Sequence, residues 1–189
     1  VEKFTGGSIS ADKTEEVYRE ILRDKKNIVL IGMPGCGKTT LGKISADKLH
    51  KKFTDTDDEI IKRINMPIAD YFARHGEESF RRIESEVIKE IAACQSLVIA
   101  TGGGAVLNPD NIRLLKENGT VVFIDRPLEK LVTTADRPLS SSRELLEKRY
   151  KERYGLYCAA ADIKIDAVDE IGQNVKNIEE VFLNENTCN

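Results

Sequence analysis

The chain has 189 residues, of which 40% are hydrophobic and 32% charged, and 29 basic against 32 acidic side chains give it a formal net charge of −3. This length and composition are typical of one compact globular domain and exclude a disordered or collagen-like chain. The near balance of charge gives no general attraction to a nucleic-acid backbone, so we expect no nucleic-acid partner. No apolar run is long enough to cross a bilayer and the first 30 residues hold no signal-peptide pattern, so we expect no membrane contact.

The cysteines indicate the redox compartment. There are four of them, Cys36, Cys94, Cys158 and Cys188, widely separated and without a C-x-x-C pair. This spacing favours neither a zinc site nor a disulfide framework. Reduced thiols, and therefore a cytoplasmic location, are the expected state.

Short apolar runs alternate along the chain with amphipathic stretches of helical periodicity. The runs that we expect to be strands are residues 27–31, 53–55, 97–100, 121–124 and 163–165. The expected helices are residues 39–49, 58–64, 68–74, 77–94, 109–117, 143–160 and 170–182. Continuous β-branched runs suit strands that are covered on both faces. The alternation predicts an α/β fold in three layers around a five-stranded parallel sheet.

The chain divides at residue 27. Residues 1–26 form a leader, in which a Gly-Gly-Ser loop precedes a short helix with Asp12 and Glu15 at capping-box spacing. Residues 27–189 contain all the expected strands and form the main domain. Within it, the polar loop 133–142 is a candidate lid.

A phosphate-binding loop follows the first strand. Residues 32–39 read Gly-Met-Pro-Gly-Cys-Gly-Lys-Thr, which satisfies the pattern G-x-x-x-x-G-K-S/T and leads into a helix. Backbone N–H groups of such a loop and helix N-terminus point at one spot, where Lys38 adds a positive charge and the Thr39 hydroxyl can bind Mg²⁺. The expected nucleotide-binding residues are Gly35, Cys36, Gly37, Lys38, Thr39 and Thr40.

The loop alone does not define the reaction, because GTPases, motor ATPases and small-molecule kinases share it. A GTPase switch protein is expected to carry Asn-Lys-x-Asp for guanine. The nearest segment, residues 163–166, reads Ile-Lys-Ile-Asp and lacks the asparagine. This lowers the expectation of a switch protein.

Two carboxylates follow the second strand, at Asp55 and Asp57. In an extended chain, residues i and i+2 point to the same side, so both are expected at one place on the carboxyl edge of the sheet. One would serve a metal ion and the other a substrate hydroxyl. The alternative is a solvated acidic turn that leads into the next helix.

Glycines and arginines supply the remaining candidates. Gly102, Gly103 and Gly104 follow the third strand and allow close backbone approach to a ligand. In the helix 77–94, Arg81 and Glu84 are three residues apart, so that Glu84 can hold the guanidinium. Arg82 instead aligns with Glu78 and Glu86 on a solvated face, which makes Arg81 the functional candidate.

Together these motifs resemble the shikimate kinase family of small P-loop kinases. The segments that carry the resemblance are residues 32–39, Phe-Thr-Asp-Thr-Asp at 53–57, Gly-Glu-Glu-Ser-Phe-Arg-Arg-Ile-Glu at 76–84, Thr-Gly-Gly-Gly at 101–104, Arg-Pro-Leu at 137–139 and Arg-Tyr-Gly-Leu-Tyr at 153–157. They run in the order of the family and span residues 27 to about 166. This combination is far more specific than a P-loop alone.

The resemblance implies a nucleoside-monophosphate-kinase-like fold with a lid, ATP and Mg²⁺ as cofactors, and phosphorylation of the 3-hydroxyl of shikimate on the way to chorismate and the aromatic amino acids. The small molecule shikimate is then the partner, and the isolated domain is expected to be a monomer. The implied roles are phosphate and metal binding by Lys38 and Thr39, Mg²⁺ binding by Asp55, contact of Asp57 with the reacting hydroxyl, carboxylate binding by Arg81 and Arg153, lining of the site by Gly102, Gly103 and Gly104, and contact of Arg137 with the phosphates from the lid. Lys38, Asp57 and Arg137 form the implied catalytic set.

Some segments depart from the family pattern. The family usually has an arginine near adenine shortly before the lid, whereas residues 129–134 read Glu-Lys-Leu-Val-Thr-Thr. Arg-Pro-Leu-Ser stands where Arg-Pro-Leu-Leu is usual, and the lid looks short. Arg149 lies one helical turn before Arg153, which leaves open which of them meets the carboxylate. The competing hypotheses are a kinase for another hydroxylated acid such as gluconate, and a non-catalytic or switch-type nucleotide-binding module.

The leader suggests a further hypothesis. Residues 4–6, Phe-Thr-Gly, followed by a short helix, resemble the C-terminal tail of shikimate dehydrogenase, the enzyme that makes the acceptor of this family, and position 1 is not Met. We therefore hypothesise that the chain is the kinase part of a longer dehydrogenase–kinase polypeptide. The alternative is an ordinary extension. The apolar stripe of the helix, Val17, Ile21 and Leu22, is expected either to dock on the kinase or to belong to a partner surface.

Overall fold

The computed structural model describes residues 24–131 and 143–184, together with residues 13, 17, 20 and 21. Its centre is a sheet of five parallel strands in the order β2-β3-β1-β4-β5. The strands are β1 Asn27–Ile31, β2 Lys52–Asp55, β3 Leu97–Ala100, β4 Gly119–Asp125 and β5 Ile163–Asp166. The predicted five-stranded parallel sheet is confirmed, and each strand lies within two residues of its predicted bounds.

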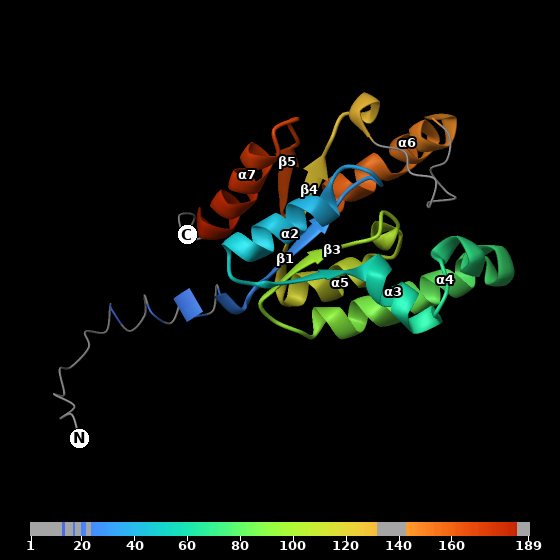
Figure 1. The fold of residues 1–189 in the computed structure, drawn as a ribbon, viewed down its shortest axis with the longest axis horizontal. Helices are drawn as coiled ribbons and strands as arrows, with labels where there is room; N and C mark the ends of the chain where they lie inside the picture. The colour runs from blue at the N-terminus through green and yellow to red at the C-terminus, as the bar shows by residue number, and fades with distance from the viewer. Residues whose placement is uncertain (1–12, 14–16, 18–19, 22–23, 132–142, 185–189) are drawn as a thin grey trace, which may run out of the picture.

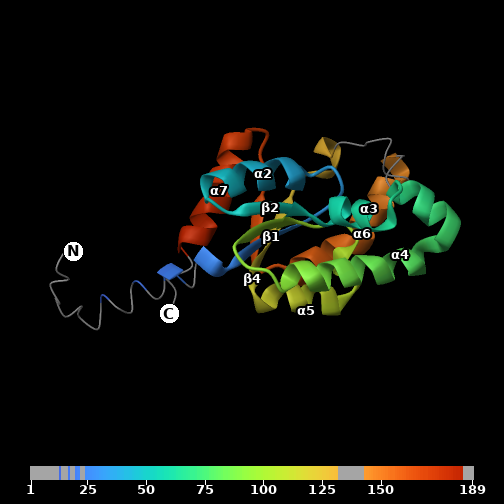
Figure 2. The same ribbon diagram turned by 60° about the horizontal axis from the view of Figure 1, so that its bottom comes forward.

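Helices cover both faces of the sheet. They are α2 Lys38–Lys48, α3 Thr56–Ile64, α4 Ile68–Ala92, α5 Pro109–Glu117, α6 Arg143–Ala160 and α7 Ile171–Asn184, with short 3₁₀ turns η1 Ala105–Leu107 and η2 Leu128–Lys130. Figure 1 shows the arrangement, and in Figure 2 α2 and α7 lie on one side of the strands while α4, α5 and α6 lie on the other. The predicted three-layer α/β fold is confirmed.

The sheet is the core of the domain. Every residue of β1 is at most 1% exposed, as expected for a central strand with helices on both faces. Asn27 at its start is also buried, and its side chain is paired: Nδ2 donates to the Cys94 carbonyl at 2.8 Å, and Oδ1 accepts from the Leu97 N–H at 2.9 Å. These bonds join the start of β1 to the turn before β3.

The two helices predicted at 68–74 and 77–94 are one element with a break. Gly76 has φ 77° and ψ 172°, which lies outside the helical region and is accessible mainly to glycine. Because of this break, the second segment of α4 begins at Glu77 with its own direction. No helix within the described residues is long and apolar enough to cross a membrane.

The chain order of the sheet predicts where a ligand binds. The chain leaves β1 into α2 on one face, and it leaves β3 toward α5 on the opposite face (Figure 2). The carboxyl ends of β1 and β3 are therefore the switch point of the sheet, the place at which parallel α/β sheets bind ligands. The loops after β1, β2 and β3 carry the candidate residues.

The end of the leader is attached to the domain by Lys51. Its Nζ donates to the backbone carbonyls of Asp24 and Lys26 at 2.7 and 2.9 Å and lies 4.5 Å from the centre of the Phe182 ring on α7. The Ser96 N–H also donates to the Lys25 carbonyl at 2.8 Å. The described leader residues from Lys13 to Lys25 are helical, and Val17 and Ile21 are exposed.

We expect Lys51→Met to lower the free energy of unfolding by about 1–3 kcal/mol, because the buried Lys51 donates to two backbone carbonyls that would lose this charged donor. Urea denaturation measures this change. Lys52→Met is the matched control, since Lys52 is exposed and surface substitutions usually change stability by less than about 0.5 kcal/mol. Equal effects of the two variants would show that Lys51 does not anchor the leader.

Candidate active site

The loop after β1 has the backbone of a phosphate-binding loop. Gly35 and Gly37 have φ of 80° and 101°, in the left-handed region that favours glycine, and Gly37 is the residue that precedes α2. At Gly32, φ is 147° and a Cβ atom would lie 2.7 Å from the Ile124 carbonyl oxygen. The loop therefore requires glycine at these positions and places the N-terminus of α2 at the switch point of the sheet.

Lys38 is folded back over this loop. Its side chain is buried, and Nζ donates to the carbonyls of Gly32 and Met33 at 2.8 and 3.0 Å. Cys36 is fully buried, with Sγ 3.7 Å from Lys38 Nζ. The Cys36 side chain is therefore part of the core behind the loop, and only its backbone can face a nucleotide.

Thr39 and Asp55 form a pair suited to a hard cation. The Thr39 hydroxyl donates to Asp55 Oδ2 at 2.7 Å, across the gap between α2 and the end of β2. Hydroxyl and carboxylate oxygens are ligands that Mg²⁺ prefers, and Mg²⁺ is usually held by one or two protein groups together with substrate phosphates and water. Among the described residues, no three His, Cys, Asp or Glu side chains gather into a metal site.

Asp57 lies at the expected edge of the sheet, but the reason given from the sequence is wrong. Asp55 ends the strand and caps α3, its Oδ1 accepting from the Asp57 N–H at 3.0 Å. Asp57 is therefore already helical, and strand alternation does not bring the two carboxylates to one side. Asp57 lies instead against the glycine loop, where a Cβ atom on Gly102 would be 2.5 Å from its Oδ1.

The three glycines after β3 form the wall between these groups. The Gly102 N–H donates to the Thr56 hydroxyl at 2.8 Å, which joins the wall to the start of α3. A Cβ atom on Gly103 would lie 2.8 Å from Pro34 Cδ, and one on Gly104 would lie 2.1 Å from Arg81 Nη1. Each glycine therefore allows the close approach of a different part of the site.

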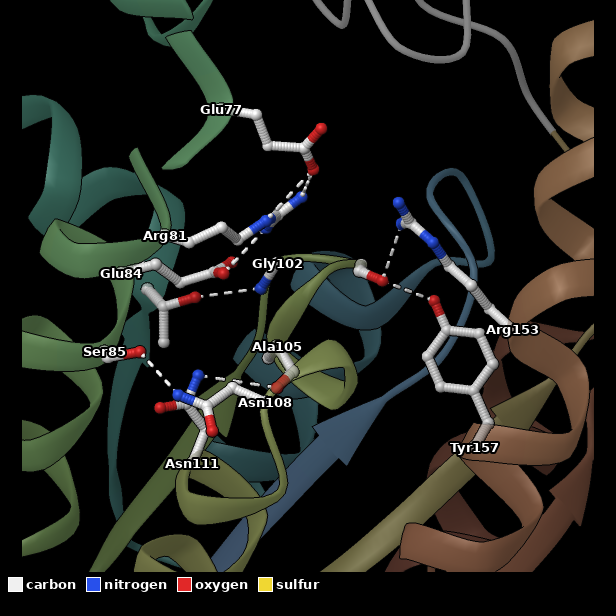
Figure 3. Close-up of polar contacts among 12 residues, drawn as sticks. Glu77, Arg81, Glu84, Ser85, Gly102, Ala105, Asn108, Asn111, Arg153 and Tyr157 are labelled. Carbon is white, nitrogen blue, oxygen red and sulfur yellow. Dashed lines mark hydrogen bonds and ion pairs between the residues drawn. The ribbon is translucent and has the colours of Figure 1, made fainter. Parts of the chain in front are cut away.

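Arg81 lies across Gly104, between two glutamates of its own helix (Figure 3). Its Nη1 donates to Glu84 Oε2 at 2.7 Å, whereas Nε and Nη2 donate to Glu77 Oε1 at 3.3 and 3.0 Å. Burial alone would lower the pKa of Arg81, but Glu84 and Glu77 outweigh it, and the pKa is raised. Burial raises the pKa of Glu84, an effect that Arg81 opposes by stabilising the carboxylate.

Arg153 and Tyr157 reach the same wall from α6. Arg153 Nη1 donates to the Gly103 carbonyl at 3.0 Å, and the Tyr157 hydroxyl donates to the same oxygen at 2.6 Å (Figure 3). Burial raises the pKa of Tyr157, so its hydroxyl stays protonated as a donor. Arg149, one turn earlier, is half-buried, and its pKa is lowered by burial and by the charge of Arg153.

Several of these contacts were not predicted from the sequence. Glu77, Thr56 and Tyr157 were not predicted to take part, although Glu77 is four residues before Arg81 and this spacing is a known helical pairing distance. Arg82 does pair with Glu78, at 3.7 Å between exposed side chains, but Glu86 pairs with Arg63. Arg137 and the candidate lid 133–142 lie outside the described residues.

Comparisons with known proteins agree with the resemblance drawn from the motifs. A family model described as shikimate kinase matches residues 34–182. A shikimate kinase of Clostridium botulinum is 45% identical over 161 residues, which cover 82% of this chain and 97% of the relative.

Solved structures give the same result. Shikimate kinase from Acinetobacter baumannii in complex with shikimate superimposes with a TM-score of 0.83 at 30% identity, covering 89% of this chain and 99% of that one. A gluconokinase from Sinorhizobium meliloti has a TM-score of 0.54 at 14% identity and covers 85% of this chain and 93% of its own; at that identity it shows a shared fold alone. The P-loop, the glycine wall with its two arginines and the extent of these matches show that the chain belongs to the shikimate kinase family.

Proposed function

We propose that this protein transfers the γ-phosphoryl group of ATP to the 3-hydroxyl of shikimate and so forms shikimate 3-phosphate for the pathway to chorismate. The main observation in support is the glycine wall. It has a carboxylate, Asp57, at Gly102 and guanidinium groups at Gly103 and Gly104. A hydroxylated ring acid needs both an acceptor for its reacting proton and cations for its carboxylate.

The roles of the nucleotide residues follow from the loop. Backbone N–H groups from Gly35 to Thr40 would hold the phosphates. Lys38 Nζ, which now donates to two carbonyls of the loop, would donate to phosphate oxygens instead. Thr39 and Asp55 would hold Mg²⁺, which supplies charge neutralisation on the phosphates when bound. Arg137 remains a sequence-based prediction for a lid contact with the transferred group.

Asp57 is the proposed acceptor for the proton of the 3-hydroxyl. It lies at the N-terminus of α3, beside the wall and near the carboxyl end of β2. Phosphoryl transfer depends mainly on positioning and on charge stabilisation. An oriented carboxylate near the loop therefore provides what the acceptor side of the reaction requires.

A panel of acceptors tests the proposal. ADP release is coupled to an optical signal with shikimate, gluconate or no acceptor, and the phosphorylated position is identified by ³¹P–¹H NMR. We expect turnover that depends on shikimate and a product phosphorylated at the 3-position. Preference for gluconate would show that gluconate, and not shikimate, is the acceptor. ATP hydrolysis independent of any acceptor would favour a switch-type module.

We expect Arg153→Ala to raise the KM for shikimate by roughly tenfold or more and to leave the KM for ATP nearly unchanged, since a charge-assisted hydrogen bond contributes about 1.5–3 kcal/mol. Arg149→Ala is the comparison, measured by the same steady-state assay. Arg153 is favoured because it contacts the Gly103 carbonyl directly. A large effect of Arg149→Ala with a small effect of Arg153→Ala would reverse the assignment.

The dehydrogenase–kinase hypothesis and the monomeric state remain proposals. The match to the family model begins at residue 34, after the leader. The attachment of Asp24 and Lys26 by Lys51 supports a fixed junction between the leader and the domain. The reading frame upstream of Val1 decides the first proposal, and light scattering of the purified domain decides the second.

A further inference from the structure

The two carboxylates that hold Arg81 differ in kind. Glu84 is 2% exposed and accepts one short bond of 2.7 Å from Nη1. Glu77 is 56% exposed, and a single oxygen accepts both of its bonds, at 3.0 and 3.3 Å. Figure 3 shows the two glutamates on opposite sides of the guanidinium group. Glu84 is therefore a fixed partner, whereas Glu77 is a weakly held and solvated one.

Glu77 occupies the edge of the Arg81 guanidinium that is best suited to bind a carboxylate. Nε and Nη2 form the side-on pair of donors with which arginine binds a carboxylate in two parallel hydrogen bonds. Nη1, on the other side, already donates to the buried Glu84. An acceptor carboxylate that uses the side-on pair of Arg81 must therefore replace Glu77.

We propose that Glu77 is a specificity-determining counter-ion of the acceptor site, which holds the outer edge of Arg81 until the carboxylate of the substrate displaces it. This inference rests on the proposed function. Glu77 keeps the guanidinium oriented over Gly104 and competes with every anion that enters. Only an anion held by further groups of the site gains enough binding free energy to displace it.

Displacement of Glu77 rather than Glu84 follows from burial and position. Removing the partner of a buried charge costs several times more than removing that of an exposed one, and Glu84 is the buried partner. Glu77 also begins the second segment of α4, directly after the non-helical Gly76. Its side chain can therefore turn to solvent without moving the helix that carries Arg81 and Glu84.

The charge around the site supports a competing role. Arg81 lies between Glu77 and Glu84, so an arriving carboxylate meets a guanidinium that is already neutralised. Glu77 also raises the pKa of Arg149, a smaller effect than burial and the charge of Arg153, which lower it. Glu77 thus interacts with cations on both α4 and α6. Without its charge, these cations attract the carboxylate of the substrate more strongly.

Glu77→Gln tests the inference because it keeps the shape of the side chain and removes its charge. The dissociation constant of shikimate is measured by calorimetry without nucleotide, and the KM values for shikimate and ATP by the coupled assay. We expect the dissociation constant and the KM for shikimate to fall at least threefold, with no fall in the KM for ATP. Benzoate, a carboxylate without hydroxyl groups, should become a stronger competitor by a larger factor, because it gains most from the loss of a competing charge.

Glu78→Gln is the matched control. Glu78 is 92% exposed and pairs with Arg82 at 3.7 Å on the solvated face, so this variant should bind shikimate and benzoate as the unchanged protein does. Glu77→Ala removes the same charge together with the side chain and should also lower the KM for shikimate. A raised or unchanged KM for shikimate in both variants would overturn the inference. Failure of the proposed function is distinct, since the unchanged protein would then show no ADP release that depends on shikimate.

Discussion

Asp57→Asn is expected to lower kcat by on the order of a hundredfold or more while ATP still binds. The amide cannot accept the proton of the attacking hydroxyl, and general-base contributions are typically of this size or larger. The carboxylate lies beside Gly102 in the first turn of α3, whereas the phosphates of ATP are expected at the loop after β1. Turnover in the coupled assay and calorimetric titration with ATP separate the two effects.

Asp58→Asn provides the control for this prediction. Asp58 is the next residue, exposed, and in the same first turn of α3, so it shares the effect of the helix dipole on a nearby charge. We expect its kcat to stay within about twofold, the range of a surface change that touches no substrate. Near-normal turnover of Asp57→Asn, or an equal loss in Asp58→Asn, would remove Asp57 from the mechanism.

The sequence predicted the fold because its signals were local and consistent. The central strands β1 and β3 are runs rich in Val, Ile and Leu. The helix α5 matches its predicted bounds because Asn108 caps it and Pro109 occupies its first position. The same reasoning could have corrected Asp57. Asp55 is followed by acidic residues in the next turn, a pattern typical of a helix start, whereas strand alternation does not extend beyond Asp55, the last residue of β2.

Side-chain pairing could be predicted only where both partners lie on the same helix. Glu84 was expected beside Arg81 from its spacing, yet Glu77 satisfies the helical spacing equally well, and sequence alone does not show which of the two is buried. The bonds from Arg153 and Tyr157 to the Gly103 carbonyl join residues 50 and 54 positions apart. Such contacts depend on how α6 packs on the glycine wall, and no local pattern contains that information.

Gly104→Ala is expected to raise the KM for shikimate tenfold or more, although it removes no charged or polar side chain from the binding site. The added Cβ atom would lie 2.1 Å from Arg81 Nη1 and 2.6 Å from Cζ, so the guanidinium must move. Gly104 has φ −101° and ψ −5°, a conformation that alanine adopts without strain. The change therefore tests the position of Arg81 while leaving its charge in the protein.

A double-mutant cycle with Arg81→Ala makes the prediction specific. If Gly104→Ala acts by moving the guanidinium, the double variant should have a KM for shikimate close to that of Arg81→Ala alone, because no guanidinium remains to be moved. Gly155→Ala on α6 is the control: a Cβ atom there has no neighbour within 4 Å, so the variant should gain about 0.5–1 kcal/mol in stability with an unchanged KM. Additive losses in the cycle would show that Gly104 acts on the substrate directly and that Arg81 is not the group it accommodates.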